Sequence, residues 1–226
     1  MTARSQHDIS GVDIEEAVVE MARAMMTSGR RRLLGIVGPP GAGKSSIGEM
    51  LGARLDNTMQ VVPMDGFHLS NRQLTRLGRA ERKGAPDTFD VQGYVALLSR
   101  LRDARQSDTI YAPDFYRELE EPIAASIAVP SATALVITEG NYLLLEEPPW
   151  SEVRKLLDEV WYLDVDTERR EQWLVERHRR FGRSADQAHA WLAATDRPNA
   201  ERIEATRHLA DRQLYWDGRL IRLTDR

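Results

Sequence analysis

The sequence contains no cysteine, which excludes disulfide scaffolds, thiol nucleophiles and zinc sites with cysteine ligands. Its five histidines include no pair spaced three or four residues apart, so a zinc site built on histidine is not expected either. No apolar run approaches the roughly 18 residues that a membrane-spanning helix requires, and residues 1–10 lack the apolar stretch of a signal peptide. From these absences we expect a soluble cytoplasmic protein with no membrane partner.

Neither sign of charge dominates the sequence. The 31 lysine and arginine residues stand against 35 aspartate and glutamate residues, which gives a formal net charge of −4 and predicts no nucleic-acid partner. Hydrophobic residues make up 42% of the 226 positions, a share that is too high for a disordered chain. We expect residues 1–226 to form one domain with a small lid, and the sequence is compatible with a monomer or a homodimer.

Short apolar runs alternate with stretches of helical periodicity along the chain. The spacing predicts an amphipathic helix from Ile14 to Met25, and Asp90 is a candidate N-cap for a helix that turns Tyr94 and Leu98 inward. Five runs are candidate strands: residues 33–37, 60–63, 134–138, 160–165 and 220–223. Because these runs are continuously apolar and alternate with helices, they predict an α/β fold, an open parallel sheet with helices on both faces.

Two long segments interrupt this alternation. Residues 66–133 separate two predicted strands by far more chain than a strand-to-helix connection needs, so we expect them to form an acceptor-binding insertion. Residues 177–199 contain several arginines around Gly182, and we expect them to form a mobile lid between two helices.

A glycine-rich loop follows the first predicted strand directly. The segment GPPGAGKS matches G-x-x-x-x-G-K-[ST] and precedes a helical stretch, residues 46–55. The glycines let backbone N–H groups surround phosphate oxygens, and the helix presents the positive end of its dipole to the same anion. Lys44 adds a charge for the β- and γ-phosphates, and the Ser45 hydroxyl is a candidate Mg²⁺ ligand. The motif predicts a P-loop NTPase fold with nucleotide contacts at Gly38, Pro39, Pro40, Gly41, Ala42, Gly43, Lys44, Ser45 and Ser46.

Two acidic residues follow predicted strands at the edge of the sheet where ligands of open α/β folds bind. Asp65 follows the run 60–63, and Glu139 follows the run 134–138. Each acid precedes a glycine, which permits a sharp turn beside the phosphates. One carboxylate could deprotonate an acceptor hydroxyl while the other holds the metal or its waters.

The predicted lid carries Arg177, Arg180 and Arg183, which are spaced three residues apart and would lie near one face of a helix. Planar guanidinium groups can bridge the oxygens of a transferring phosphoryl group. We expect at least one of them to act from the lid, with Arg180 as the catalytic candidate and Arg177 and Arg183 as nucleotide contacts. The spacing alone does not choose among the three.

In their order along the chain, these motifs resemble the P-loop small-molecule kinases that include phosphoribulokinase, uridine kinase and pantothenate kinase, over residues of about 30–225. The resemblance implies ATP and Mg²⁺ as cofactors and a parallel sheet of about five strands. The segment MDGF is similar to the pantothenate kinase segment with the catalytic aspartate, which implies that Asp65 is the base. Glu139 matches the acidic residue that these kinases place near Mg²⁺, which implies a metal site with Ser45.

The same resemblance implies the acceptor contacts, to which Asp65 and Glu139 also belong. The segment KGAPDTFD looks like the uridine kinase segment that holds acceptor hydroxyls, through Asp87, and His68 is expected either to touch the acceptor or to pack. Further contacts fall where uridine kinases touch the nucleoside, although the histidine of that segment is absent: Tyr111, Asp114, Phe115 and Arg117. The implied reaction moves the γ-phosphoryl group of ATP to a hydroxyl of a nucleoside, a sugar or a pantothenate-like metabolite.

Two other functions stay open. A P-loop NTPase with a regulatory role shares the phosphate loop, although neither Lys83 nor Lys155 begins the [NT]-K-x-D element that reads guanine. A nucleoside monophosphate kinase needs a second phosphate site, for which the sequence offers Arg72, Arg76, Arg79 and Arg82. A protein kinase is not expected, because the H-R-D, D-F-G and V-A-I-K motifs are absent.

Overall fold

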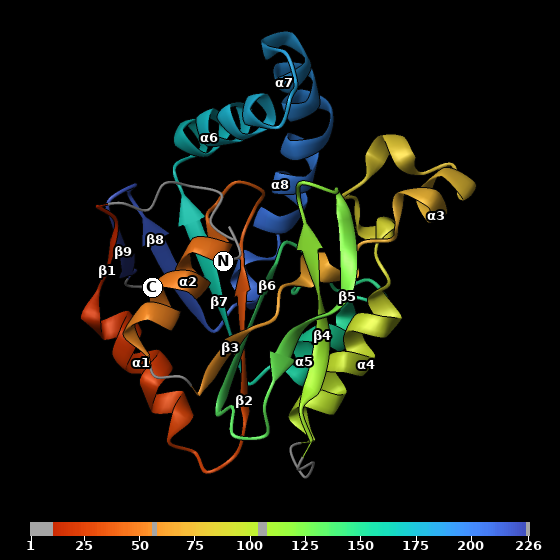
Figure 1. Cartoon of the computed structure of the whole chain (residues 1–226). Helices are drawn as coiled ribbons and strands as arrows, with labels where there is room; N and C mark the ends of the chain where they lie inside the picture. Colours follow the sequence, from red (N-terminus) through yellow and green to blue (C-terminus); the bar gives the residue numbers. More distant parts are fainter. Residues whose placement is uncertain (1–10, 56–57, 104–107, 225–226) are drawn as a thin grey trace.

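Figure 1 shows the computed structural model of the chain, which describes residues 11–55, 58–103 and 108–224. Among these residues, seven strands form one sheet in the order β1-β9-β8-β7-β2-β6-β3. Their bounds are β1 (Asp13–Ile14), β2 (Arg32–Val37), β3 (Met59–Val61), β6 (Leu135–Gly140), β7 (Glu159–Val165), β8 (Arg212–Trp216) and β9 (Leu220–Leu223). The predicted α/β class is confirmed, and the sheet has more strands than the five expected.

Five adjacent strands, from β8 through β3, run parallel to one another. The sequence pattern missed β8, because this strand begins with two polar residues and fully buries only Leu214 and Trp216. The predicted strand β9 belongs to the sheet but pairs antiparallel with β8. The connection between them, residues 217–219 with Gly218 at φ +94°, is too short for the crossover that a parallel pair requires.

Helices cover both faces of the sheet, as predicted. α1 (Glu16–Met26) and α2 (Lys44–Arg54) pack on one face, and α4 (Val91–Arg102) and α5 (Ser151–Leu156) pack on the other (Figure 1). Successive residues of β2 serve the two cores, since Leu33 packs on the α4 side and Leu34 on the α1 side. A parallel strand covered on both faces needs apolar residues at every position, which explains the continuous runs in the sequence.

The insertion at residues 66–133 contains short helices and a separate hairpin. Its elements are η1 (Met64–Phe67), α3 (Asn71–Arg76), η2 (Ala80–Arg82), η3 (Pro86–Thr88), α4, β4 (Ile110–Tyr116) and β5 (Glu121–Val129). Asp90 caps α4 as predicted, accepting a hydrogen bond from the Gly93 N–H at 2.9 Å. The hairpin lies against η1 so closely that a Cβ on Gly66 would meet the Pro113 carbonyl oxygen at 2.5 Å. The hairpin thereby fixes the segment that follows β3.

The segment predicted as a lid between two helices, residues 177–199, is itself helical. It contains the end of α6 (Thr167–Arg180), α7 (Ala185–Trp191), the π-helix η4 (Leu192–Asp196) and the start of α8 (Arg197–Glu204), with η5 (Arg207–Leu209) beyond it. Gly182, at φ +96°, reverses the chain after α6, and Ser184 caps α7 in a capping box. Figure 1 shows α6 and α7 beyond the carboxyl ends of the parallel strands. In the described part of the chain, no helix has the length and apolar character to cross a membrane.

Candidate active site

The phosphate loop, residues 38–45, connects β2 to α2 and is packed from two sides. Gly43 adopts φ +86°, and a Cβ there would lie 2.0 Å from the Trp216 ring of β8. Gly41 adopts φ +79°, and its Cβ would meet the Leu174 side chain of α6 at 2.6 Å. Only glycine fits at these two positions, so the sequence motif determines how closely β8 and α6 approach the loop.

The Lys44 side chain is buried in the loop. Its Nζ donates hydrogen bonds to the carbonyl oxygens of Gly38 (2.9 Å) and Pro39 (3.0 Å) and to Oδ1 of Asn141 (2.7 Å). Burial lowers the pKa of Lys44 to about 8, and the negative charge of Glu139 opposes this shift. The ammonium group is thus held by neutral oxygens, from which anionic phosphates could draw it.

Ser45 and Glu139 form an oxygen pair at the mouth of the loop. The Ser45 hydroxyl donates to Oε1 of Glu139 at 2.8 Å. Burial raises the pKa of Glu139, and the nearby charge of Asp65 raises it further. An alcohol next to one carboxylate fits Mg²⁺, which takes its other ligands from phosphates and water. Within the described residues, no cluster of three acidic or histidine side chains could hold a metal without such help.

Asp65 lies in η1, directly after the carboxyl end of β3. Its Oδ2 accepts a hydrogen bond from Arg117 Nη2 at 3.1 Å. Burial would raise the pKa of Asp65, but the interaction with His68 and the positive charges of Arg117 and Lys44 together outweigh burial and hold the pKa below its ordinary value. Asp65 is therefore a carboxylate at neutral pH, oriented by an arginine from the β4–β5 hairpin.

His68 lies in the wall beside Asp65 and is stacked between two aromatic rings. Its ring centroid lies 4.0 Å from that of Phe89 and 4.8 Å from that of Phe115. His68 Nδ1 lies 2.8 Å from the Asp65 carbonyl oxygen, which can only accept, so Nδ1 carries the proton. Burial lowers the pKa of His68 and keeps the ring neutral at pH 7. The Lys83 ammonium lies 5.1 Å from the Phe115 centroid in the same wall.

The opposite wall comes from residues 177–199, the segment predicted as a lid and called the lid below. Arg177 reaches the cavity from the last turn of α6, and burial, with the charge of Arg117 across the cavity, lowers its pKa to about 10. Arg183 follows the turn at Gly182, and its guanidinium lies 4.1 Å from the Trp191 ring centroid. Arg177 therefore remains charged at neutral pH.

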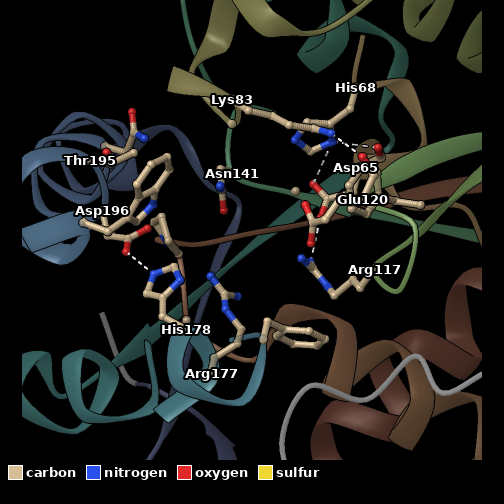
Figure 2. A pocket seen from close by; sticks show the side chains of 18 of the residues that line it. Asp65, His68, Lys83, Arg117, Glu120, Asn141, Arg177, His178, Thr195 and Asp196 are labelled. Atoms are coloured by element: carbon tan, nitrogen blue, oxygen red, sulfur yellow. Dashed lines mark hydrogen bonds and ion pairs between the residues drawn. The ribbon is translucent and has the colours of Figure 1, made fainter. Parts of the chain in front are cut away.

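One cavity of about 480 Å³ connects the phosphate loop, the Asp65 wall and the lid. Figure 2 shows Asp65, His68 and Arg117 on one side and Arg177 and His178 on the other. The sequence-predicted residues that line it are Pro40, Gly41, Gly43, Lys44, Ser45, Ser46, Asp65, His68, Phe115, Arg117, Glu139, Arg177 and Arg183. The predicted loop residues Gly38, Pro39 and Ala42 lie behind this lining, where the first two hold Lys44.

The predicted catalytic arginine, Arg180, is exposed and does not line the cavity. The prediction placed three arginines on one helical face, but α6 ends at Arg180, so Arg183 lies outside that helix. The turn at Gly182 returns the chain and brings Arg183 back toward Arg177. The structure therefore brings two of the three predicted arginines together.

Three predicted acceptor contacts also lie away from the cavity lining. Asp87 is exposed, and its carboxylate forms a bidentate pair with Arg82. Tyr111 is 58% exposed, because on β4 it alternates with two buried neighbours. Asp114 is buried just past the irregularity in β4, and its Oδ1 accepts from the next backbone N–H at 3.0 Å.

The second phosphate site that a nucleoside monophosphate kinase would need is not formed at the predicted place. The cavity is lined in this region by Asn71, Ala80, Glu81 and Lys83, and none of the four predicted arginines belongs to the lining. Arg79 and Arg82 are engaged with Asp87 instead.

Several cavity residues were not predicted from the sequence. They lie both outside the lid and within it, and include Asn71, Lys83, Glu120, Asn141, His178, Phe181, Trp191, Thr195, Asp196 and Asn199. Asn141 follows Glu139-Gly140 and could have been found from its position after a strand. The lid residues have no such signal, because His178 and Asp196 meet across 18 positions of chain.

No protein-family model matches the chain. The protein named putative uridine kinase from Schizosaccharomyces pombe is 31% identical over 201 residues, which cover 85% of this chain and 85% of that protein. The ATP-dependent kinase-like protein notR' from Aspergillus versicolor is 36% identical over 152 residues, 64% of this chain and 88% of that protein. The solved structure named putative fructose transport system kinase, from Silicibacter sp. TM1040, has a TM-score of 0.79 at 35% identity and covers 88% of this chain and 97% of that one.

Proposed function

This chain belongs to the uridine kinase-like family of P-loop kinases and is an ATP-dependent kinase, and we propose that it phosphorylates a hydroxyl group of a small metabolite. The observation that carries the proposal is the single cavity that holds both the phosphate loop and Asp65. A hydrolase needs to position only water beside the γ-phosphate. Here the cavity extends past Asp65 to His68, Phe115 and Lys83, and this part of the cavity leaves room for an acceptor.

The phosphate loop is the proposed ATP site. Its backbone N–H groups surround the phosphates, and Lys44 exchanges its neutral partners for β- and γ-phosphate oxygens. Ser45 and Glu139 would hold Mg²⁺, which supplies positive charge to the phosphate oxygens. ATP and Mg²⁺ are thus the proposed cofactors.

Asp65 is the proposed general base. The acceptor oxygen attacks the γ-phosphorus, its proton passes to the Asp65 carboxylate, and the bond from the γ-phosphorus to the β–γ bridging oxygen breaks to release ADP. Arg117 donates a hydrogen bond of 3.1 Å to the carboxylate, and His68, Arg117 and Lys44 together keep the pKa of Asp65 low, so that the base is ionised. Arg177 would face the charge that develops on the transferring group, and with Arg183 it would exclude water from the lid side.

The proposed acceptor is a nucleoside, a sugar or a pantothenate-like alcohol. The names of two relatives refer to uridine and to fructose transport, which supports the first two classes. The wall offers the Phe115 ring, the neutral His68 ring and the Asn71 amide, a mixture that suits a polar molecule with a flat or apolar face. A nucleoside monophosphate is less well supported, because the candidate arginines for its phosphate lie outside the cavity lining.

An acceptor panel tests this proposal. Uridine, cytidine, fructose, glycerate, pantothenate and UMP are each incubated with the enzyme, ATP and Mg²⁺, with ADP followed by a coupled assay and products by mass spectrometry. We expect one hydroxyl acceptor to raise ADP formation about tenfold or more over the acceptor-free rate and to gain one phosphoryl group. An equal rate with every compound and with none would instead indicate a hydrolase.

A further inference from the structure

A chain of hydrogen bonds runs through the lid behind Arg183. His178 Nε2 lies 2.8 Å from Oδ2 of Asp196, and Arg183 Nη1 lies 2.8 Å from His178 Nδ1. The side chains of His178 and Asp196 are each only 8% exposed. All three residues line the cavity (Figure 2 labels His178 and Asp196).

The direction of each hydrogen bond follows from the chemistry of arginine. A guanidinium only donates, so His178 Nδ1 must be the unprotonated acceptor. The ring proton then resides on Nε2 and is donated to the Asp196 carboxylate. A ring protonated on Nδ1, or on both nitrogens, would point an N–H donor at Arg183, and the hydrogen bond between the two side chains would be lost. The arrangement therefore requires a neutral His178 in the Nε2–H form.

The Arg183 guanidinium is held on a second side by an aromatic ring. It lies 4.1 Å from the Trp191 centroid, at a stacking distance, and Trp191 is edge-on to His178 with a centroid separation of 6.4 Å. A long arginine side chain with one surface contact samples many rotamers, whereas a guanidinium fixed by a ring and by a hydrogen bond samples few. These contacts determine where the charge of Arg183 lies.

The four side chains come from separate segments of the lid. His178 belongs to α6, Arg183 to the following turn, Trp191 to the end of α7 and Asp196 to the π-helix η4. A π-helix changes the direction of the side chains that follow it, and such turns are frequent at functional sites. Here it places Asp196 behind His178.

We infer that His178 and Asp196 are positioning residues, which affect phosphoryl transfer by holding the Arg183 guanidinium in the cavity wall. Asp196 selects the tautomer of His178, and His178 presents the acceptor that fixes Arg183. The kinetic part of this inference rests on the proposed function. The predicted tautomer of His178 and the predicted effect of its substitution on melting temperature do not depend on the proposed function.

Nitrogen-15 NMR of the histidine rings tests whether Asp196 selects the tautomer of His178, and it requires no enzyme turnover. In the wild type at pH 7, we expect His178 to show an unprotonated Nδ1 and a protonated Nε2, with the signal assigned by its loss in His178→Gln. An Nδ1–H tautomer or a charged ring would overturn the inference. This result holds whether or not the acceptor panel finds a substrate.

Two amide variants separate the roles of the two ring nitrogens. Asparagine can place its amide oxygen near the Nδ1 position and accept from Arg183, but it does not reach Asp196. Glutamine can place its amide nitrogen near the Nε2 position and donate to Asp196, but it leaves Arg183 without its acceptor. His178→Asn should therefore melt at a lower temperature and keep kcat within about threefold, whereas His178→Gln should melt near the wild type and lose about tenfold in kcat. Activity that simply follows melting temperature would overturn the positioning role.

A double-mutant cycle gives the sharpest kinetic test, using ATP and the panel acceptor that the wild type phosphorylates fastest. If His178 acts only through Arg183, the variant His178→Gln with Arg183→Gln should be no slower than Arg183→Gln alone, about tenfold below the wild type. Losses that multiply to about a hundredfold would show that His178 acts independently and would overturn the inference. A wild type that phosphorylates no acceptor would contradict the proposed function. The NMR experiment would still test whether His178 has the tautomer that accepts a hydrogen bond from Arg183.

Discussion

The two sides of the cavity hold their positive charges in different ways. On the loop side, the ammonium of Lys44 is bound largely by backbone carbonyls five and six residues earlier in the chain. On the lid side, Arg183 is held by the side chains of His178 and Trp191, which come from different helices. Backbone carbonyls stay in place as long as the loop does, whereas the lid contacts require several segments to pack together. The loop charge is thus preorganised locally, and the lid charge depends on tertiary structure.

The largest expected effect concerns Asp65, the proposed general base. Asp65→Asn keeps the shape of the side chain but removes the proton acceptor, so kcat should fall by roughly 10²–10⁴ while binding of MgATP is retained. Transfer rates and calorimetric titration with ATP measure the two quantities. Asp13→Asn, an exposed carboxylate on edge strand β1, is the matched control. Loss of nucleotide binding in Asp65→Asn, in step with kcat, would place Asp65 at the nucleotide instead.

On the loop side, Lys44→Ala should lower the transfer rate by roughly 10²-fold or more, because a buried charge beside the transferring group is removed. Lys155→Ala, in the exposed part of α5, is the control and should match the wild type. Steady-state kinetics with the best acceptor measures both variants. Near-normal turnover in Lys44→Ala would contradict the kinase mechanism.

On the lid side, the structure distinguishes Arg177, which lines the cavity, from Arg180, which is exposed, whereas the sequence spacing did not distinguish them. Arg177→Gln should reduce transfer by about 10- to 100-fold with a smaller effect on ATP binding, because its charge faces the cavity. Arg180→Gln, one turn further along α6 and exposed, should stay within about twofold of the wild type. If Arg180→Gln is the more damaging variant, the lid has a different arrangement during catalysis, and the contrast between the two arginines fails.

The smallest expected effect is conditional on metal concentration. Glu139→Gln weakens the proposed oxygen pair with Ser45, so its defect should be about tenfold at low Mg²⁺ and should shrink when Mg²⁺ is raised or replaced by Mn²⁺. A Mg²⁺ titration of the transfer rate, run beside Asp65→Asn, measures the difference. Rescue of Asp65→Asn by metal, with none for Glu139→Gln, would exchange the two assigned roles.

The geometry of the loop side could be predicted from the sequence because its contacts are local. The motif around Lys44 and Ser45, the apolar strands and the Asp90 cap each depend on residues within a few positions of one another. The acids after β3 and β6 could be predicted because parallel strands bring their carboxyl ends together.

The lid and the acceptor wall depend on tertiary packing, which residue spacing does not encode. The spacing does not choose among Arg177, Arg180 and Arg183, because it shows neither the end of α6 nor the turn at Gly182. The family resemblance implies that Asp87 contacts the acceptor, but in the structure Asp87 pairs with Arg82. The strand β8 was missed because its burial is partial. In each case the outcome depends on which neighbour a side chain meets in the folded chain.

The destination of the γ-phosphoryl group tests the central claim most directly. The wild type is incubated with γ-labelled ATP, Mg²⁺ and the best acceptor of the panel, and the label is followed into the acceptor and into inorganic phosphate. We expect the label to move mainly to a hydroxyl of the acceptor, and Asp65→Asn to slow this transfer by roughly 10²–10⁴. Label released only as inorganic phosphate, with every acceptor tested, would contradict the proposed kinase activity.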